Sequence, residues 1–306
     1  MKKKKAKIRK KRNSIKKTRS HSSLLSLLII IIVITVGFHF YKFIHHEIRS
    51  IVETPKTDTK KVPEEVKGKI SPNYSEVYRV PILLYHYVEY VADKRDTIRQ
   101  SLNINPNTFE LQVKTLSDAG YIFITAKELG EVIGGQRELP KKPILLTFDD
   151  GHWDFDTVIL PILKKYHAKA TAYVVPGFLN GSDFLTDEQL RDVINSHLVD
   201  VGAHTVHHVY LKGKILPIVQ YEVNQSKHML ENKFNIKVSS FAYPGGAFDQ
   251  QVINVIKDAG FTTAVTTIPG VLQSEQNKYF LFRLRPGYRT GNELLNYLNQ
   301  TQFKPY

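Results

Sequence analysis

Alternating strand-like and helix-like patterns predict an α/β fold, either a barrel or a doubly wound sheet. Continuous apolar runs such as Pro143–Phe148 (PILLTF) are typical of parallel strands that are buried on both faces. Amphipathic segments separate these runs, and polar motifs follow several of them, where α/β folds place their sites. The 306 residues, 42% of them apolar, suffice for one or two domains.

The elements follow one another from residue 79 onward. Helix 105–120 has apolar residues at helical spacing, with Asn107 or Thr108 as its cap and Gly120 as its end. The other helices are expected at 126–133, 154–167, 186–196, 215–233, 248–259 and 291–299. The strands are expected at 79–87, 121–125, 143–148, 170–175, 198–203, 238–243, 262–266 and 280–285.

The net charge of +14 belongs to the N-terminus rather than to the folded body. Residues 1–20 contain twelve Lys or Arg and no acid, which leaves about +2 for the rest of the chain. A nucleic-acid binder would need basic and aromatic residues over its folded body. We therefore expect no nucleic-acid partner.

An apolar run, Leu24–Tyr41, follows the basic tail directly. Its 18 residues would form about 27 Å of helix, close to the ~30 Å hydrocarbon layer of a membrane. The rival reading, a cleaved signal peptide, predicts a shorter run and small residues at its end, where Phe38–Tyr41 stand instead. We expect a single-pass membrane anchor with the basic side in the cytoplasm.

This anchor implies four parts. Residues 1–23 would be a basic cytoplasmic tail, 24–41 the transmembrane helix, and 42–77 a polar extracellular linker. Residues 78–306 would be an extracellular catalytic domain attached to the cell membrane. The chain has no Cys, so a metal site would need His and carboxylate ligands.

Two carboxylates, Asp149 and Asp150, end the buried strand 143–148 (TFDDG). Adjacent carboxylates at such a place are costly unless positive charge lies beside them, which a divalent metal would provide. The alternative is that an Asp simply caps the following helix.

A histidine cluster, His204-Thr205-Val206-His207-His208, follows strand 198–203. His204 and His208 would project from one face of a helical turn and suit one metal ion, although His204 and His207 also fit by spacing. A plain surface loop is the other interpretation. The carboxylate pair on another strand favours a metal site of two His and one Asp.

Two further segments stand near strand ends. In Phe241–Gly246 (FAYPGG), proline and two glycines would let backbone approach a ligand closely, unless the segment is an ordinary turn. His86, within Tyr85-His86-Tyr87, would on its own be read as a core residue.

Together these motifs resemble the polysaccharide deacetylase family, with its NodB homology domain (carbohydrate esterase family 4). TFDDG, HTVHH and FAYPGG occur in the family's order, and the stretch at 84–88 (LYHYV) resembles the poly-N-acetylglucosamine deacetylase branch. The resemblance covers about residues 79–290. It implies a deformed (β/α) barrel, with fewer than eight units, that binds one divalent ion, most commonly Zn²⁺, with Co, Ni or Mn as other choices.

The resemblance also assigns roles to residues. Asp149 matches the catalytic base. Asp150, His204 and His208 match the metal ligands. The backbone N–H of Gly245 matches the group that binds the oxyanion, and Tyr243 and Pro244 of the same motif are expected to contact substrate.

The chain departs from the family pattern in three places. It lacks the arginine form of the third motif, the Asp-x-x-Asp-Trp motif, and the late Leu-x-His motif that supplies the usual acid. His86 is then the candidate acid. The late strand contains Arg283 and Arg285, expected to contact substrate or to orient Asp149.

The implied function is metal-dependent removal of acetyl groups from an extracellular polysaccharide that contains N-acetylglucosamine. A metal-activated water and a general base suit amide hydrolysis. The alternative is a non-catalytic carbohydrate-binding protein of the same fold. Such a relative would lack the base or a ligand, yet all four acidic and histidine residues are present.

Overall fold

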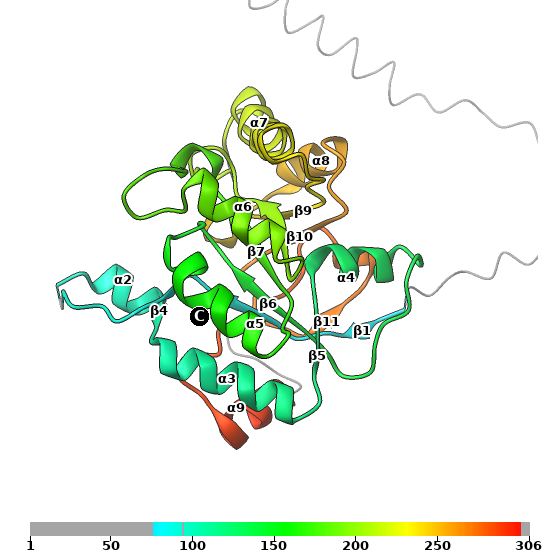
Figure 1. Ribbon diagram of the computed structural model, residues 1–306. Helices are drawn as coiled ribbons and strands as arrows, with labels where there is room; N and C mark the ends of the chain where they lie inside the picture. The colour runs from blue at the N-terminus through cyan, green and yellow to red at the C-terminus, as the bar shows by residue number, and fades with distance from the viewer. Residues whose placement is uncertain (1–75, 94, 301–306) are drawn as a thin grey trace, which may run out of the picture. The chain divides into compact units, whose positions relative to one another are not determined.

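The computed structural model describes residues 76–93 and 95–300. The expected basic tail, the apolar run and nearly all of the expected linker lie outside these residues. No helix within the described ranges is long and apolar enough to cross a membrane. The described residues form one α/β unit, with helices around a central sheet (Figure 1).

A curled parallel sheet forms the centre of the described part, as the apolar runs predict. Its spatial order is β10-β9-β8-β7-β6-β2, and β5 pairs with the first half of β6. The strands are β2 (Ile82–Tyr85), β5 (Ile122–Ile124), β6 (Pro143–Phe148), β7 (Ala170–Val174), β8 (Val199–Ala203), β9 (Ser240–Ala242) and β10 (Thr263–Val265). Every residue of β6 and β7 is buried, as expected for strands with helices on their outer face and core side chains on the other.

The segment Leu281–Leu284 closes the gap between the two edge strands. Leu281 bridges to Val265 of β10, and Leu284 bridges to Leu83 of β2, both in parallel. The Leu284 N–H donates to the Ile82 carbonyl at 2.7 Å, and the Leu84 N–H donates to the Leu284 carbonyl at 2.9 Å. The expected strand 280–285 is thus present as single bridges, and it completes a deformed barrel.

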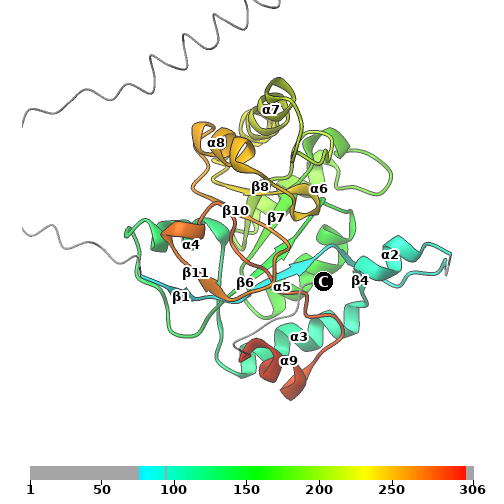
Figure 2. The same ribbon diagram turned by 180° about the vertical axis from the view of Figure 1, so that it is seen from behind.

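Helices pack around the outside of this barrel (Figures 1 and 2). They are α3 (Pro106–Asp118), α4 (Ala126–Ile133), α5 (Leu160–Lys165), α6 (Asp187–Asn195), α7 (Leu216–Phe234), α8 (Gln250–Asp258) and α9 (Gly291–Leu298). The cap of α3 is Asn105, whose side chain accepts from the Thr108 N–H, rather than Asn107 or Thr108 as expected. Pro106 explains the shift, because a proline is favoured at the first helical position.

Three short helical turns connect these elements: η2 (Pro176–Phe178), η3 (Pro244–Gly246) and η4 (Glu275–Asn277). The expected helix 154–167 begins instead as a π-helix, η1 (Phe155–Ile159), before α5. Such π-segments are frequent at functional sites.

The expected strand 79–87 is divided into β1 (Tyr78–Arg79), β2 and β3 (Tyr87–Val88). Pro81, which has no N–H to donate to a sheet, stands between β1 and β2. β1 pairs with β11 (Leu272–Gln273), and β3 pairs with β4 (Asn103–Ile104). Between β3 and β4, α2 (Thr97–Leu102) projects from the body, an element absent from the sequence-based prediction.

Candidate active site

Asp149 lies at the end of β6, nearly buried, with both carboxylate oxygens paired. Arg283 donates to Oδ1 from Nη1 at 2.7 Å and to Oδ2 from Nη2 at 2.8 Å. Burial by itself would raise the pKa of Asp149, but the Arg283 guanidinium and the neighbouring histidines lower it, and the net shift is downward. Asp149 is therefore an ionised carboxylate of fixed orientation, as a general base must be.

Arg283 is fully buried and is itself held in place. Its Nε donates to the Thr266 carbonyl at 2.7 Å, and its Nη1 also donates to Thr147 Oγ1 at 3.2 Å. Of the two expected arginines, Arg283 thus orients Asp149. Its complete burial contradicts the expectation that it contacts substrate.

Asp150 lies next to Asp149 but faces two histidines. Its Oδ1 is 3.4 Å from His204 Nε2 and 3.3 Å from His208 Nε2. Ligand atoms of these three residues all lie within 4.8 Å of one another. The predicted trio is brought together from the ends of β6 and β8.

The donor atoms of this cluster fit a cation. His204 Nδ1 lies 2.7 Å from the Ala242 carbonyl, so Nδ1 carries the proton and Nε2 turns its lone pair toward Asp150. Asp150 Oδ1 is buried without a hydrogen-bond partner. Electron-rich atoms that converge in this way, with one of them unsatisfied, are what a divalent ion would bind.

The histidine loop is not the helical turn that we expected. Thr205 and His208 have left-handed φ values of 62° and 54°, so the loop doubles back to bring His208 beside His204. Asp150, with φ of 78°, is strained as well. Three strained non-glycine residues around one cluster are typical of a functional site.

Glu222 of α7, which the sequence did not single out, holds this loop. Its buried carboxylate accepts from the N–H groups of Val206 and His207, at 2.8 and 3.0 Å, and lies 2.9 Å from His207 Nδ1. His207 is thereby paired outside the cluster, which excludes it as the alternative to His208.

His152 is a second residue that the sequence analysis missed, although it stands only two positions after Asp150. Its Nε2 lies 3.4 Å from Asp150 Oδ2, and its Nδ1 lies 3.2 Å from the Asp183 carbonyl. Its ring is stacked between Tyr87 and Phe184, with centroid distances of 3.9 and 4.9 Å. His152 therefore supports the second oxygen of Asp150.

His86 follows β2 directly, and its Nδ1 has no hydrogen-bond partner. Burial lowers its pKa to about 4, even though Asp149 and Asp150 act in the opposite direction. The ring is therefore neutral at pH 7.

The third motif forms the turn η3. Gly245 has a left-handed φ of 63°, and a Cβ placed on it would lie 2.3 Å from Tyr210 Cε1. The ring of Tyr210, itself 58% exposed, fills the space that a side chain would need. Glycine is required here both by conformation and by this contact.

Two expected substrate contacts from this motif are core residues instead. Tyr243 is fully buried, and its hydroxyl donates to the Tyr279 carbonyl at 2.8 Å. Pro244 is also buried. The Tyr243 ring packs edge-to-face against the buried Phe241 ring, and the Tyr243 hydroxyl has its hydrogen-bond partner inside the protein. Arg285, by contrast, is partly exposed and lines a hollow described below.

Comparison with known proteins agrees with this geometry. Residues 136–264 match the family model for polysaccharide deacetylases. A Bacillus subtilis protein assigned to the polysaccharide deacetylases, YxkH, is 30% identical over 207 residues, covering 68% of this chain and 71% of that protein.

Two further relatives cover more of the chain. The poly-β-1,6-N-acetyl-D-glucosamine N-deacetylase of Staphylococcus aureus is 23% identical over 254 residues, which are 78% of this chain and 84% of the relative. The solved Streptococcus pyogenes deacetylase PplD, in complex with acetate, has a TM-score of 0.67 and 29% identity, covering 74% of this chain and 100% of that structure.

Proposed function

The chain belongs to the polysaccharide deacetylase family, and we propose that it hydrolyses acetamido groups of an extracellular polysaccharide containing N-acetylglucosamine. The observation that carries this proposal is the buried Arg283–Asp149 pair beside the cluster of Asp150, His204 and His208. It supports the proposal because an oriented carboxylate lies beside residues that would hold a cation. The products would be acetate, the molecule bound in the solved Streptococcus pyogenes relative, and a free amine on the sugar.

Asp150, His204 and His208 would hold the ion, which we propose is Zn²⁺, with Co²⁺, Ni²⁺ or Mn²⁺ as other candidates. When bound, it would polarise the acetyl carbonyl and lower the pKa of water. Asp149 accepts a proton as the water oxygen attacks the carbonyl carbon. The Gly245 N–H would donate to the carbonyl oxygen as negative charge develops on it.

The C–N bond then breaks, and the departing nitrogen needs a proton. We assign its delivery to His86. Because the ring is neutral before reaction, it must receive that proton during turnover, and the proton taken up by Asp149 is the natural source. The proton that His86 passes to the amine would thus come from the water molecule by way of Asp149.

The purified full-length chain tests the proposal against three polymers: peptidoglycan, poly-N-acetylglucosamine and a chitin oligomer. Release of acetate, with an equal amount of free amine, is expected from at least one. Binding without acetate release, at saturating zinc, would favour the non-catalytic carbohydrate-binding alternative instead.

We also propose that residues 24–41 anchor the protein and that the catalytic domain lies outside the cell. The support is the run of twelve basic residues before 18 uncharged ones. Protease added to intact cells should degrade the domain. Full protection would contradict the topology, and a mature form beginning near residue 40 would indicate a signal peptide.

A further inference from the structure

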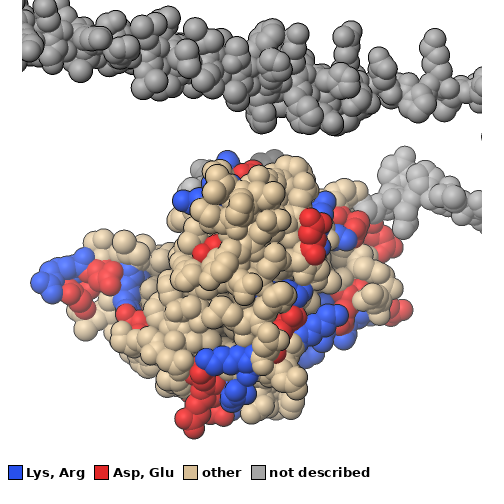
Figure 3. Space-filling model, turned by 90° about the horizontal axis from the view of Figure 1, so that it is seen from above, with Lys and Arg blue, Asp and Glu red and all other residues tan. Residues whose placement is uncertain are grey.

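An arm formed by residues 87–93 and 95–104 projects from the domain beside the candidate active site. It consists of β3, a loop, α2 and β4, and it extends from the body in Figures 1 and 2. In the view of Figure 3, Lys or Arg and Asp or Glu side chains lie together on the projection at the left. Charges of both signs are thus mixed there.

An open hollow of about 450 Å³ lies where the arm meets the body. Tyr90 and Tyr288 line it, and they are 66% and 59% exposed. Exposed tyrosine rings present an apolar face together with a polar tip. The apolar C–H face of a sugar ring can pack on such a surface while its hydroxyls remain hydrated.

The polar groups of the hollow suit a neutral ligand. Glu89, the acidic residue of its lining, is ion-paired with Arg99. Asn105 uses its carbonyl oxygen to cap α3, and Gln100 uses its amide N–H to bond the Asp93 carbonyl. The NH₂ of Asn105 and the side-chain oxygen of Gln100 are left for hydroxyl or acetamido groups.

A second hollow, of about 250 Å³, adjoins the first. The two share Asn103, and the second is also lined by Arg285 and by Leu84 and Tyr85 at the end of β2. The next residue along the chain is His86. Arg285 lies close enough to His86 for its charge to lower the pKa of that ring, so the two hollows extend from the exposed tyrosines to the neighbourhood of the proposed proton donor.

The arm is also fixed directly to the candidate metal site. The Arg99 guanidinium lies 4.6 Å from the centre of the Tyr87 ring, and Tyr87 stacks on His152, which faces Asp150. A ligand in the hollow would therefore have a defined position relative to the reacting groups.

We propose that Tyr90 and Tyr288 form an outer sugar-binding position, which holds a neighbouring sugar of the same polysaccharide chain while another sugar reacts. This proposal rests on the proposed function and deepens it. An enzyme built in this way acts on a polymer in preference to a single acetylated sugar, because the outer position contributes binding only for longer substrates.

The test compares a pentamer of N-acetylglucosamine with the monomer, using the full-length protein loaded with zinc. Tyr90→Ala and Tyr288→Ala should each raise the KM for the pentamer by about fivefold, as expected for loss of one aromatic contact. The monomer rate should not change. Tyr288→Phe keeps the ring and should retain most of the pentamer affinity.

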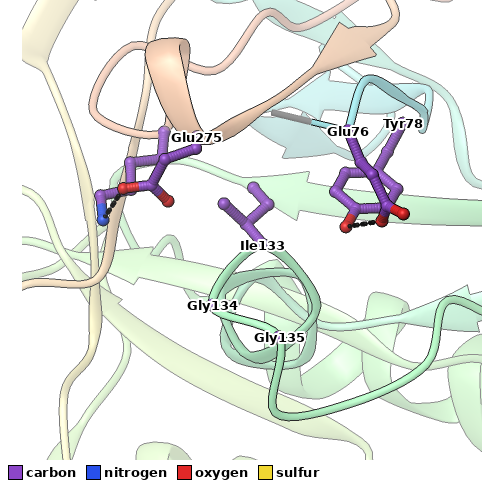
Figure 4. A pocket seen from close by; sticks show the side chains of 7 residues that line it. Glu76, Tyr78, Ile133, Gly134, Gly135 and Glu275 are labelled. Atoms are coloured by element: carbon purple, nitrogen blue, oxygen red, sulfur yellow. Dashed lines mark hydrogen bonds and ion pairs between the residues drawn. The ribbon is translucent and has the colours of Figure 1, made fainter. Parts of the chain in front are cut away.

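Tyr78→Ala is the matched control. Tyr78 lines a hollow of about 590 Å³ with Glu76 and Glu275, and its hydroxyl donates to Glu76 (Figure 4). β1, which contains Tyr78, precedes the parallel strands, and the lining residues Gly134 and Gly135 follow α4, so this hollow lies toward the opposite edge of the sheet from Asp150. The control should leave both substrates unaffected.

Equal effects of the two tyrosine variants on pentamer and monomer, or no effect on either, would overturn the outer position. Failure of the proposed function is distinguishable by calorimetry. If the wild-type protein releases no acetate yet binds the pentamer, and Tyr288→Ala weakens this binding, the sugar position stands while the hydrolytic activity does not.

Discussion

Arg283 and Asp149 form a buried, two-point ion pair across 134 residues of sequence. Two parallel N–H···O bonds fix both the charge and the plane of the carboxylate, which a single lysine could not do. Arg283, from the closing segment Leu281–Leu284, thus keeps Asp149, which follows β6, ionised and in a fixed orientation.

Replacing Arg283 by Gln should destabilise the protein by about 3–5 kcal/mol, because it leaves a buried charge without a partner. Arg283→Lys should cost less stability, yet still lower kcat by at least about 10²-fold, since the fork is lost. Urea unfolding and acetate release measure the two effects. Arg289→Lys, at a part-exposed arginine that pairs with Glu293, is the control and should stay within about 0.5 kcal/mol. An unaffected Gln variant would refute the pairing.

The two neighbouring histidines should differ in metal binding. His208→Gln should weaken zinc binding by more than about 100-fold, because loss of a direct ligand costs more than loss of a residue that only supports a ligand. His207→Gln should retain the ion, because that ring pairs with Glu222. Elemental analysis after dialysis gives the answer. The reverse pattern would show that the ligand set is wrong.

Gly245 and Gly213 share a left-handed backbone, with φ of 63° and 75°, but only Gly245 touches a ring. Gly213→Ala should cost about 1 kcal/mol from backbone strain alone. Gly245→Ala should cost more and should lower kcat, because Cβ collides with Tyr210. Adding Tyr210→Ala should recover part of the lost stability. If the two single variants are equal in thermal stability and activity, the contact has no role.

His86→Asn should lower kcat by at least about 10²-fold while the bound metal is retained. Asparagine keeps a polar group but cannot pass a proton. Parallel measurement of turnover and metal content separates this role from damage to the site. Near-normal turnover would mean that the amine receives its proton from water or from another side chain.

Asp200 of β8 should make stability depend on pH. Burial raises its pKa to about 7, and its Oδ2 has no hydrogen-bond partner. A raised folded-state pKa means that the folded chain holds the proton more tightly, so stability is greatest below about pH 4 and falls as pH rises toward 7. Asp200→Asn should remove this loss.

Asp200→Asn should therefore gain a few kcal/mol relative to the wild type between pH 4 and pH 8. Denaturant unfolding at both pH values measures this difference. For Asp118→Asn, at an exposed carboxylate, the difference in stability from the wild type should be the same at both pH values, which makes it the control. A difference that is also the same at both pH values for Asp200→Asn would mean that the Asp200 carboxylate is solvated.

The sequence alone predicts the site residues that directly follow regular strands. Asp149, Asp150 and His204 follow long apolar runs, and parallel strands bring their carboxyl ends to one edge of the sheet. The same runs predict most strands and helices within a few residues. Apolar patterns of this kind determine where a strand lies in the sequence and at which edge of the sheet it ends.

Contacts between distant segments decided the rest. Arg283 and Arg285 are two apart and look equivalent, and only the closing of the barrel buries one of them. The choice between His207 and His208, which lie in a loop, depends on Glu222 of α7. Tyr243 looked like a ligand contact because its motif is rich in glycine, but its ring faces the core. The arm has no regular spacing of apolar residues, so its helix α2 could not be predicted from the sequence.

The closing segment Leu281–Leu284 also has a consequence for the biosynthesis of the protein. A ribosome completes β6 and its acidic pair long before it reaches these residues. Until they emerge, β2 and β10 have unpaired edges, and Asp149 has no counter-charge, a state that favours aggregation. The domain can therefore reach its native state only after residues 281–284 have been translated, and a chain that stops before residue 281 should remain dependent on chaperones or be degraded.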